Sequence, residues 1–205
     1  MLHVERLLAG PYGENAYLAY LSDHSDALMV DPGGQSEMLL SALRKSGKQL
    51  SHILLTHGHF DHILATYDIA QATGAKVVIH KLDAPMLMDP APLKLPEEYA
   101  PLFHPMQPDL ALEEGPITLC GMEIELIHTP GHTPGGACYY IPAHRAIFTG
   151  DTVFAEGYGR TDFSGGNMQQ MRQSLLRLFQ LPNDVIAHPG HGDSASMAQI
   201  VNWFQ

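Results

Sequence analysis

Residues 56–62, Thr-His-Gly-His-Phe-Asp-His, constrain this chain most, because they place three imidazoles and a carboxylate within six consecutive positions. They follow the apolar run Ile53–Leu55, which is typical of a buried strand. After them, helical spacing from Ile63 to Ala70 predicts a helix that stops at Gly74. The cluster is therefore expected on a strand-to-helix turn at the carboxyl end of a strand, where α/β sheets usually place their sites.

The spacing within this stretch predicts two metal ions. On an extended turn, side chains two residues apart point the same way, so His57 and His59 are expected to share one ion. Asp61 and His62 enter the first helical turn and are expected to point toward a second ion. The alternative is a polar turn that is merely rich in histidine, but the other ligands that such a site needs occur later in the chain.

Three later turns supply those ligands, each directly after an apolar strand. They present His132 within residues 129–135, Asp151 within 149–152 and His191 within 189–192. Neighbouring glycine and proline residues let the backbone and an ion approach closely. Five imidazoles and two carboxylates suit zinc, iron or manganese better than calcium. We therefore expect two divalent metal ions, with zinc as the first choice and iron or manganese as alternatives.

Composition narrows the classes of protein to which the chain could belong. Its 205 residues, 45% of them hydrophobic, predict one globular domain over residues 1–205. No apolar run approaches ~18 residues and no signal-peptide stretch opens the chain, so we expect no membrane span and no export. Two cysteines fit a cytoplasmic protein, and a net charge of −11 argues against nucleic acid as a partner. The expected partner is a small molecule, and the oligomeric state stays open.

Strands and helices are predicted along the whole chain. Strands are expected at residues 4–8, 16–21, 27–30, 76–79, 117–120, 122–127, 136–141, 145–148 and 185–187. Helices are expected from Ser36, as the capping residue, to Gly47, and from a capping Asn167 to a point before Pro182. A closing helix should begin at about Ser194.

The segment from Pro85 to Pro116 has no regular periodicity, because prolines interrupt it throughout. A long irregular segment inside a compact domain is usually a lid, a binding loop or disordered. Its apolar content favours a cap over the mouth of the active site. A surface loop packed by its own side chains is the alternative.

The order of the ligand residues resembles the metallo-β-lactamase superfamily. This resemblance implies an α/β fold, a four-layer αββα sandwich with the metal site at the edge between the two sheets. It assigns the first ion to His57, His59 and His132 and the second to Asp61, His62 and His191, with Asp151 bridging the two. It implies catalytic roles for Asp61 and Asp151. Asp31, at the end of the third strand, is expected to bond the backbone around residues 57–62 without binding an ion.

Within the superfamily, residues 130–135 (Pro-Gly-His-Thr-Pro-Gly) and 157–162 (Gly-Tyr-Gly-Arg-Thr-Asp) resemble the glyoxalase II group, the hydroxyacylglutathione hydrolases. In that group the basic residue after the second glycine binds the glutathione moiety, and here this residue is Arg160. The tyrosine that assists glutathione binding there is absent, and the chain ends thirteen residues after Gly192, without the carboxy-terminal helical domain. The resemblance is therefore to the short, glyoxalase II-like branch, and it implies thioester hydrolysis.

The chemistry of such a site favours a hydrolase. Two ions that share one water lower its pKa from ~15.7 toward ~7 and so supply hydroxide at neutral pH. A bridging Asp151 would keep the ions at a fixed spacing and help to orient that hydroxide. A thiolate leaves with little help from an acid, which suits a thioester substrate and a site that has no separate general acid.

Other activities remain as alternatives. Persulfide dioxygenases have a similar Gly-x-Gly-Arg-Thr-Asp stretch but use a single iron, whose ligands here would be His57, His132 and Asp151. The second set of ligands, including His191, ranks this alternative below the hydrolase. A metal-dependent lactonase or another ester hydrolase, and a metal-binding module without catalysis, rank lower still.

Overall fold

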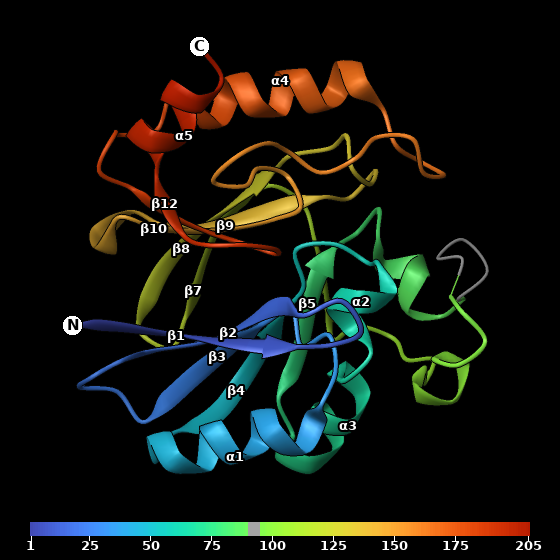
Figure 1. Ribbon diagram of the computed structural model, residues 1–205. Coiled ribbons are helices and arrows are strands. Elements are labelled where there is room, and N and C mark those ends of the chain that lie inside the picture. Colours follow the sequence, from blue (N-terminus) through green and yellow to red (C-terminus); the bar gives the residue numbers. More distant parts are fainter. Residues whose placement is uncertain (90–94) are drawn as a thin grey trace.

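Two six-stranded sheets pack face to face in the computed structural model, which describes residues 1–89 and 95–205 (Figure 1). The first sheet has the strands in chain order, namely β1 Leu2–Ala9, β2 Glu14–Leu21, β3 Asp26–Val30, β4 Gln49–Leu54, β5 Lys76–His80 and β6 Leu110–Leu112. The second has the order β12-β11-β10-β9-β8-β7, with β7 Gly115–Leu119, β8 Met122–His128, β9 Ala137–Ile141, β10 Ala146–Gly150, β11 Ile186–Pro189 and β12 Ala195–Ser196.

Helices cover the outer face of each sheet (Figure 1). The first sheet is covered by α1 Ser36–Ser46, α2 Phe60–Ile63 and α3 Thr66–Thr73, and the second by α4 Met168–Leu178 and α5 Met197–Trp203. Short 3₁₀ helices occur at η1 Ala84–Leu87, η3 Ala100–Leu102 and η4 Pro142–His144. The predicted four-layer αββα sandwich is confirmed.

Successive side chains along a strand point to opposite faces of its sheet, and in this way they fill the three interfaces between the four layers. In β4 and just beyond it, Ile53 and Leu55 face the helices α1–α3, whereas Leu54 packs between the two sheets. In the second sheet, Tyr139 packs between the sheets and Cys138 faces α4 and α5. Strands that are buried on both faces show continuous apolar runs, which is why residues 53–55 carry no polar alternation.

Strand direction brings the ends of several strands to one edge. Strands β3, β4, β5 and β6 run parallel, so the turns that follow them leave the first sheet on the same side. In the second sheet β8 and β10 both run antiparallel to β9, and β11 runs parallel to β10. The turns after β8, β10 and β11 therefore also share one edge, and these turns carry the predicted ligands.

Local details of two helices differ from the predictions. The helix expected from Ile63 to Gly74 is divided into α2 and α3, and the Ala65 N–H between them donates to Pro32 O at 3.0 Å. Ser36 is not a cap, because the residue before α1 is Gln35, in a left-handed conformation with φ 45°. The predicted end of α1 at Gly47 and the cap at Asn167, whose side chain accepts from Gln170 N–H, are confirmed.

The proline-rich segment is more regular than predicted. It contains strand β6, which extends the first sheet because the edge of β5 offers free backbone groups to it. Its described part packs against the core on the α2 and α3 side, and Tyr99 stacks on Phe60 with ring centroids 6.2 Å apart. Pro90 and Pro92 lie outside the described residues. A cap over the active site stays a prediction.

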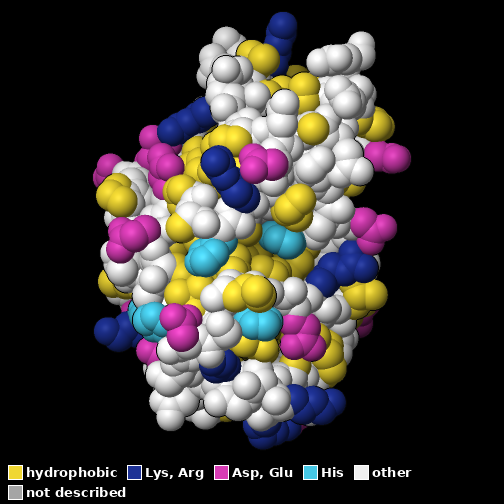
Figure 2. Space-filling view, turned by 90° about the vertical axis from the view of Figure 1, so that its left-hand side faces the viewer, with side chains coloured by type: hydrophobic (Ala, Val, Ile, Leu, Met, Phe, Trp, Pro, Cys, Tyr) yellow, Lys and Arg dark blue, Asp and Glu magenta, His cyan; other side chains and the backbone are white. Residues whose placement is uncertain are grey.

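The surface and the helix lengths bear on possible partners. On the face shown in Figure 2, acidic and basic side chains are interspersed around a hydrophobic centre that includes histidines. Nucleic acid binding depends on a field of basic side chains. That the protein has no nucleic-acid partner stays our prediction. Over residues 1–89 and 95–205, every helix is too short or too polar to cross a membrane.

Candidate metal centre

All seven predicted ligand side chains meet where the two sheet edges face each other. The first sheet supplies His57 and His59 from the turn after β4, and Asp61 and His62 from α2. The second sheet supplies the remaining three from the turns after β8, β10 and β11, namely His132, Asp151 and His191. The site is therefore built from both sheets, and its geometry depends on how they pack.

His57, His59 and His132 form one cluster, which we call the three-histidine group. Its rings are close together, with centroids 4.8 Å apart for His57 and His59 and 4.5 Å apart for His59 and His132. One nitrogen of each ring lies within 4.8 Å of the others. Three imidazoles that converge in this way form a common set of ligands for zinc and similar ions.

Asp61, His62 and His191 form a second cluster, the aspartate–histidine group. The Oδ2 atom of Asp61 lies 3.8 Å from Nε2 of His62 and 3.6 Å from Nε2 of His191. These three ligand atoms also lie within 4.8 Å of one another. The helical turn of α2 thus brings Asp61 and His62 together with His191. The ring of His62 also lies beside that of His57, with centroids 4.2 Å apart, so the two groups adjoin each other.

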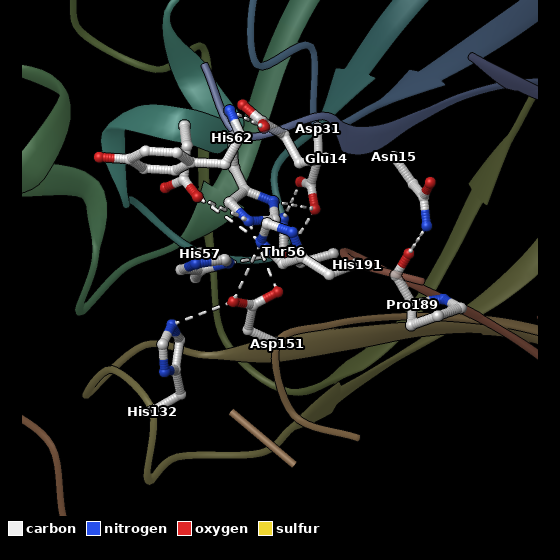
Figure 3. A network of polar contacts seen from close by, with 12 residues as sticks. Glu14, Asn15, Asp31, Thr56, His57, His62, His132, Asp151, Pro189 and His191 are labelled. Carbon is white, nitrogen blue, oxygen red and sulfur yellow. Dashed lines mark hydrogen bonds and ion pairs between the residues drawn. The ribbon is translucent and has the colours of Figure 1, made fainter. Parts of the chain in front are cut away.

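Asp151 lies between the two groups (Figure 3). Its Oδ2 atom is 3.5 Å from Nε2 of His132 and 3.6 Å from Nε2 of His191, and its Oδ1 atom is 3.5 Å from Nε2 of His62. These separations are long for hydrogen bonds. They are close to the ~3.4 Å between neighbouring ligands of a tetrahedral zinc ion. Asp151 therefore occupies the position from which one carboxylate could reach two ions.

The imidazoles are held from behind through Nδ1. His57 Nδ1 lies 3.0 Å from Thr56 Oγ1, His62 Nδ1 lies 3.1 Å from Asp31 Oδ2, and His132 Nδ1 lies 2.7 Å from the backbone oxygen of Arg160.

With Nδ1 engaged, Nε2 of each ring points into the site. Within the described part of the chain, these three Nε2 atoms and Asp151 Oδ1 are buried without a hydrogen-bond partner. Buried polar atoms are costly unless something pairs with them. The donor set, its orientation and its orphaned atoms therefore fit metal ions.

Asp31 supports this arrangement by contacting Thr56 as well as His62. Its Oδ1 accepts from the Thr56 N–H at 2.8 Å, and its Oδ2 accepts from the Thr56 hydroxyl at 2.6 Å. Asp31 has a left-handed backbone with φ 48°, which aspartate tolerates better than most residues. The backbone group that Asp31 binds is that of Thr56, directly before residues 57–62, and the contact within that stretch is to the His62 ring.

Burial keeps two members of the three-histidine group neutral. Burial, reinforced by the charge of neighbouring histidines, holds the pKa of His57 well below its usual range. Burial and then His132 lower the pKa of His59 to about 3. Both rings are therefore uncharged at pH 7 and keep a lone pair available, as metal ligation requires.

The aspartate–histidine group has the opposite electrostatics. Burial lowers the pKa of His62, but the carboxylates of Asp151, Asp61 and Asp31 outweigh it and raise that pKa to about 10. Such a concentration of carboxylates stabilises positive charge at this point, whether a proton or a metal ion carries it.

A cavity of about 390 Å³ opens onto both groups. Its lining combines ligand side chains with three aromatic rings and one cation, namely Tyr12, His59, Phe60, Asp61, His132, Asp151, Arg160, Phe163, Ser164 and His191. The size suits a small-molecule ligand. The aromatic rings give the cavity an apolar surface beside the ligand atoms.

Arg160 lies at this cavity, but its guanidinium is already engaged. Its Nε and Nη2 donate to the two carboxylate oxygens of Asp162 at 2.8 and 2.6 Å, and its Cζ lies 4.0 Å above the ring of Phe163. The sequence left open whether Arg160 binds substrate or braces its loop. The ion pair with Asp162 agrees with the bracing role, and the position of Arg160 in the cavity lining agrees with substrate binding, so the structure is compatible with both roles.

Sequence analysis missed the residues that hold the His191 turn. The side chain of Asn15 donates to Pro189 O at 2.9 Å, and the Tyr17 hydroxyl donates to the same oxygen at 2.7 Å. At Gly190, a Cβ atom would lie 2.4 Å from Asp151 Oδ1, so only glycine lets the turn approach so closely. No local signal marks Asn15 or Tyr17, because their partners are backbone oxygens far along the chain.

A family model described as the metallo-beta-lactamase superfamily matches residues 9–191. The chain belongs to this superfamily. A curated relative, the hydroxyacylglutathione hydrolase GloC of Haemophilus influenzae, is 31% identical over 97% of this chain and 94% of its own length. The superfamily and this relative indicate a metal-dependent hydrolase that binds divalent ions.

Solved structures agree with this assignment. The BLEG-1 B3 metallo-beta-lactamase superposes with a TM-score of 0.88 at 32% identity, over 98% of this chain and 97% of that one. TTHA1623 in a di-iron-bound form gives a TM-score of 0.82 at 35% identity, over 96% of both chains. The predicted superfamily and fold are thus confirmed.

Metal binding should stabilise the fold, because it pairs the orphaned Nε2 atoms. An ion at about 100 times its Kd adds about 2.7 kcal/mol to the free energy of unfolding. In a chain of this size that raises Tm by roughly 5–11 °C per ion. Thermal unfolding of metal-stripped protein, with and without zinc, measures the gain.

Two histidine variants show which residues cause the rise in Tm that zinc produces. His132→Ala should lose a large part of this rise in Tm, whereas His24→Ala, at an exposed turn, should keep it. If zinc leaves the Tm of the unsubstituted protein unchanged, the buried imidazoles are not ligands.

Proposed function

We propose that the protein is a dinuclear metal-dependent hydrolase that cleaves thioesters of the hydroxyacylglutathione type. The observation that carries this proposal is the position of Asp151, whose carboxylate lies 3.5 Å from His132 of one group and 3.5 Å from His62 of the other. A carboxylate between two complete sets of ligands suits a pair of ions.

The proposed ligands follow the two groups. The three-histidine group would hold the first ion and the aspartate–histidine group the second, with Asp151 bridging them. When bound, such ions polarise a carbonyl and lower the pKa of a coordinated water. Zinc is our first choice, and the di-iron-bound relative TTHA1623 supports iron as an alternative.

The chain's own residues would do the rest. Tyr12, Phe60 and Phe163 would hold the substrate's apolar part and exclude water from the reacting carbonyl. Asp61 and Asp151 would accept hydrogen bonds from an attacking water and so orient it. The leaving thiol has a pKa near ~8.5, so it departs as a thiolate without a separate general acid. The name of the relative GloC supports a glutathione thioester as the substrate.

A second candidate is a persulfide dioxygenase with one iron. Its ligands would be His57, His132 and Asp151, and the rings of the two histidines do lie close together, with centroids 4.9 Å apart. The aspartate–histidine group favours the hydrolase, because a mononuclear enzyme has no use for a second complete set of ligands.

Metal content and substrate choice together test the proposal. Zinc-loaded protein should contain about two ions per chain. It should cleave a hydroxyacylglutathione thioester faster than a lactone or a β-lactam, and a chelator should abolish the activity. Asp151→Ala should lower kcat by more than about 100-fold, since even residues behind the ligands cost 10–100-fold.

The matched control for this experiment is Asp184→Ala. Asp184 is an exposed carboxylate that pairs only loosely with Arg145, at 3.8 Å, and its loss should leave turnover unchanged. A single tightly held iron, no second ion on adding zinc or manganese, and oxidation of a persulfide would replace the hydrolase by the dioxygenase.

The side chain of Arg160 separates substrate binding from bracing. Arg160→Ala removes the guanidinium but keeps the backbone oxygen that holds His132. We expect KM for a glutathione thioester to rise about 10-fold with little change in kcat, since a charged hydrogen bond of about 1.5 kcal/mol acts equally in ground and transition states. For a neutral thioester the change should be small.

Arg177→Ala is the control for Arg160, because Arg177 also pairs with a carboxylate, that of Glu114, but lies outside the cavity lining. If Arg160→Ala lowers kcat/KM equally for the glutathione thioester and the neutral thioester, or loses metal, then Arg160 braces its loop and does not bind substrate.

A further inference from the structure

We propose that Asp83 is a positioning residue that sets the geometry of the three-histidine group by joining the turns that carry its ligands. The inference rests on the proposed function, in that it concerns the ions of the same site. Asp83 itself is not a ligand and does not line the cavity among the described residues.

The carboxylate of Asp83 bonds to both ligand turns. Its Oδ2 accepts from the Gly58 N–H at 3.1 Å and from the Thr133 hydroxyl at 2.7 Å. Its Oδ1 accepts from the Gly135 N–H at 2.6 Å. Gly58 lies between His57 and His59 in the chain, and Thr133 directly follows His132. One oxygen atom therefore connects residues that adjoin all three ligands in the chain, through the backbone of Gly58 and the side chain of Thr133.

This use of Asp83 differs from the ordinary role of an aspartate at its position. Asp83 precedes the 3₁₀ helix η1, where aspartate commonly caps the first turn with its side chain. Here the side chain makes no capping bond. It turns instead toward the ligand turns and is fully buried, with 0% of its surface exposed. A buried carboxylate is tolerated because three donors satisfy it.

The connection matters because the two turns belong to different sheets. The turn with His57 and His59 follows β4 of the first sheet, and the turn with His132 follows β8 of the second. A shift between the sheets would separate His132 from the other two ligands. Asp83 comes from a third turn, after β5, and opposes that shift beside the ligands themselves.

Close packing shows that the arrangement is specific. A Cβ atom at Gly135 would lie 2.5 Å from the Asp83 nitrogen and 2.6 Å from its Oδ1, so a side chain there would displace the carboxylate. The aspartate–histidine group is supported separately, since the Nδ1 of His62 is held by Asp31. Changing Asp83 should therefore affect one group and spare the other.

Asp83→Asn keeps the shape of the side chain and removes one acceptor. In either orientation its amide would face a backbone N–H, that of Gly58 or that of Gly135, where the carboxylate now accepts. Two donors cannot pair, so one ligand turn would lose a hydrogen bond from its backbone to residue 83. The experiment is a titration of the metal-stripped full chain with zinc against a chromophoric chelator, which resolves the affinity of each ion. His132→Ala and His191→Ala assign each step to its group.

We expect Asp83→Asn to weaken binding to the three-histidine group by about 10–100-fold, the usual effect of residues that orient ligands, and to leave the other step unchanged. The control is Asp109→Asn, since Asp109 Oδ2 also accepts from a backbone N–H in the first sheet, that of Val77 at 2.8 Å, far from the ligand turns. It should change neither step. Asp83→Asn with both affinities unchanged, or with both weakened equally, overturns the proposal.

Thr133→Val provides a milder test if Asp83→Asn does not fold. It removes one of the three donors, and it should weaken the same step to a smaller extent. Unchanged binding at the three-histidine group in this variant overturns the proposal. The titration uses metal alone, so a protein that cleaves no thioester but shows this selective loss would contradict the proposed function and not the role of Asp83. A protein that binds only one ion would contradict the dinuclear proposal. The change in affinity for that ion in Asp83→Asn would still test the role of Asp83.

Discussion

The hydrogen bonds behind the buried imidazoles are the interactions on which the rest of the site depends. Thr56, Asp31 and the backbone oxygen of Arg160 each engage one Nδ1 atom, so the opposite nitrogen of each ring is directed inward. Imidazoles that ligate metals are oriented in this way, because the bond at one nitrogen selects the tautomer that leaves a lone pair on the other. Without an ion these buried nitrogens carry a desolvation cost. Metal binding and folding are therefore linked in this chain.

Because the ligand side chains come from both sheets, the geometry of the site depends on how the two sheets pack. Besides the ligands and the bonds of Asn15, Tyr17 and Asp83, the sheets are joined nearby by the Tyr139 hydroxyl, which donates to Leu55 O at 3.0 Å, and by the Ala137 N–H, which donates to Thr56 O at 2.8 Å. Ions shared between ligands of both sheets would add to these connections. The lining of the adjoining cavity combines the aromatic side chains of Tyr12, Phe60 and Phe163 with the carboxylates of Asp61 and Asp151, so apolar surface and negative charge lie side by side there.

Sequence reasoning found the side chains that meet at this site because their signals are local. Each lies just after a predicted strand, and parallel strands that end together bring such turns together. It missed Asp83, although an acidic residue shortly after a buried strand resembles Asp31 in its setting. The partners of Asp83 are 25 to 52 residues away, at spacings that carry no pattern. Strand β6 was missed for a related reason, since the open edge of β5 and not its own composition makes it a strand.

Anomalous X-ray diffraction from crystals of the zinc-loaded protein tests the two-ion account most directly. The account predicts two zinc peaks, one among the Nε2 atoms of the three-histidine group and one within the aspartate–histidine group, with the Asp151 carboxylate between them. A single peak at full zinc occupancy, or zinc bound away from Asp151, would contradict it.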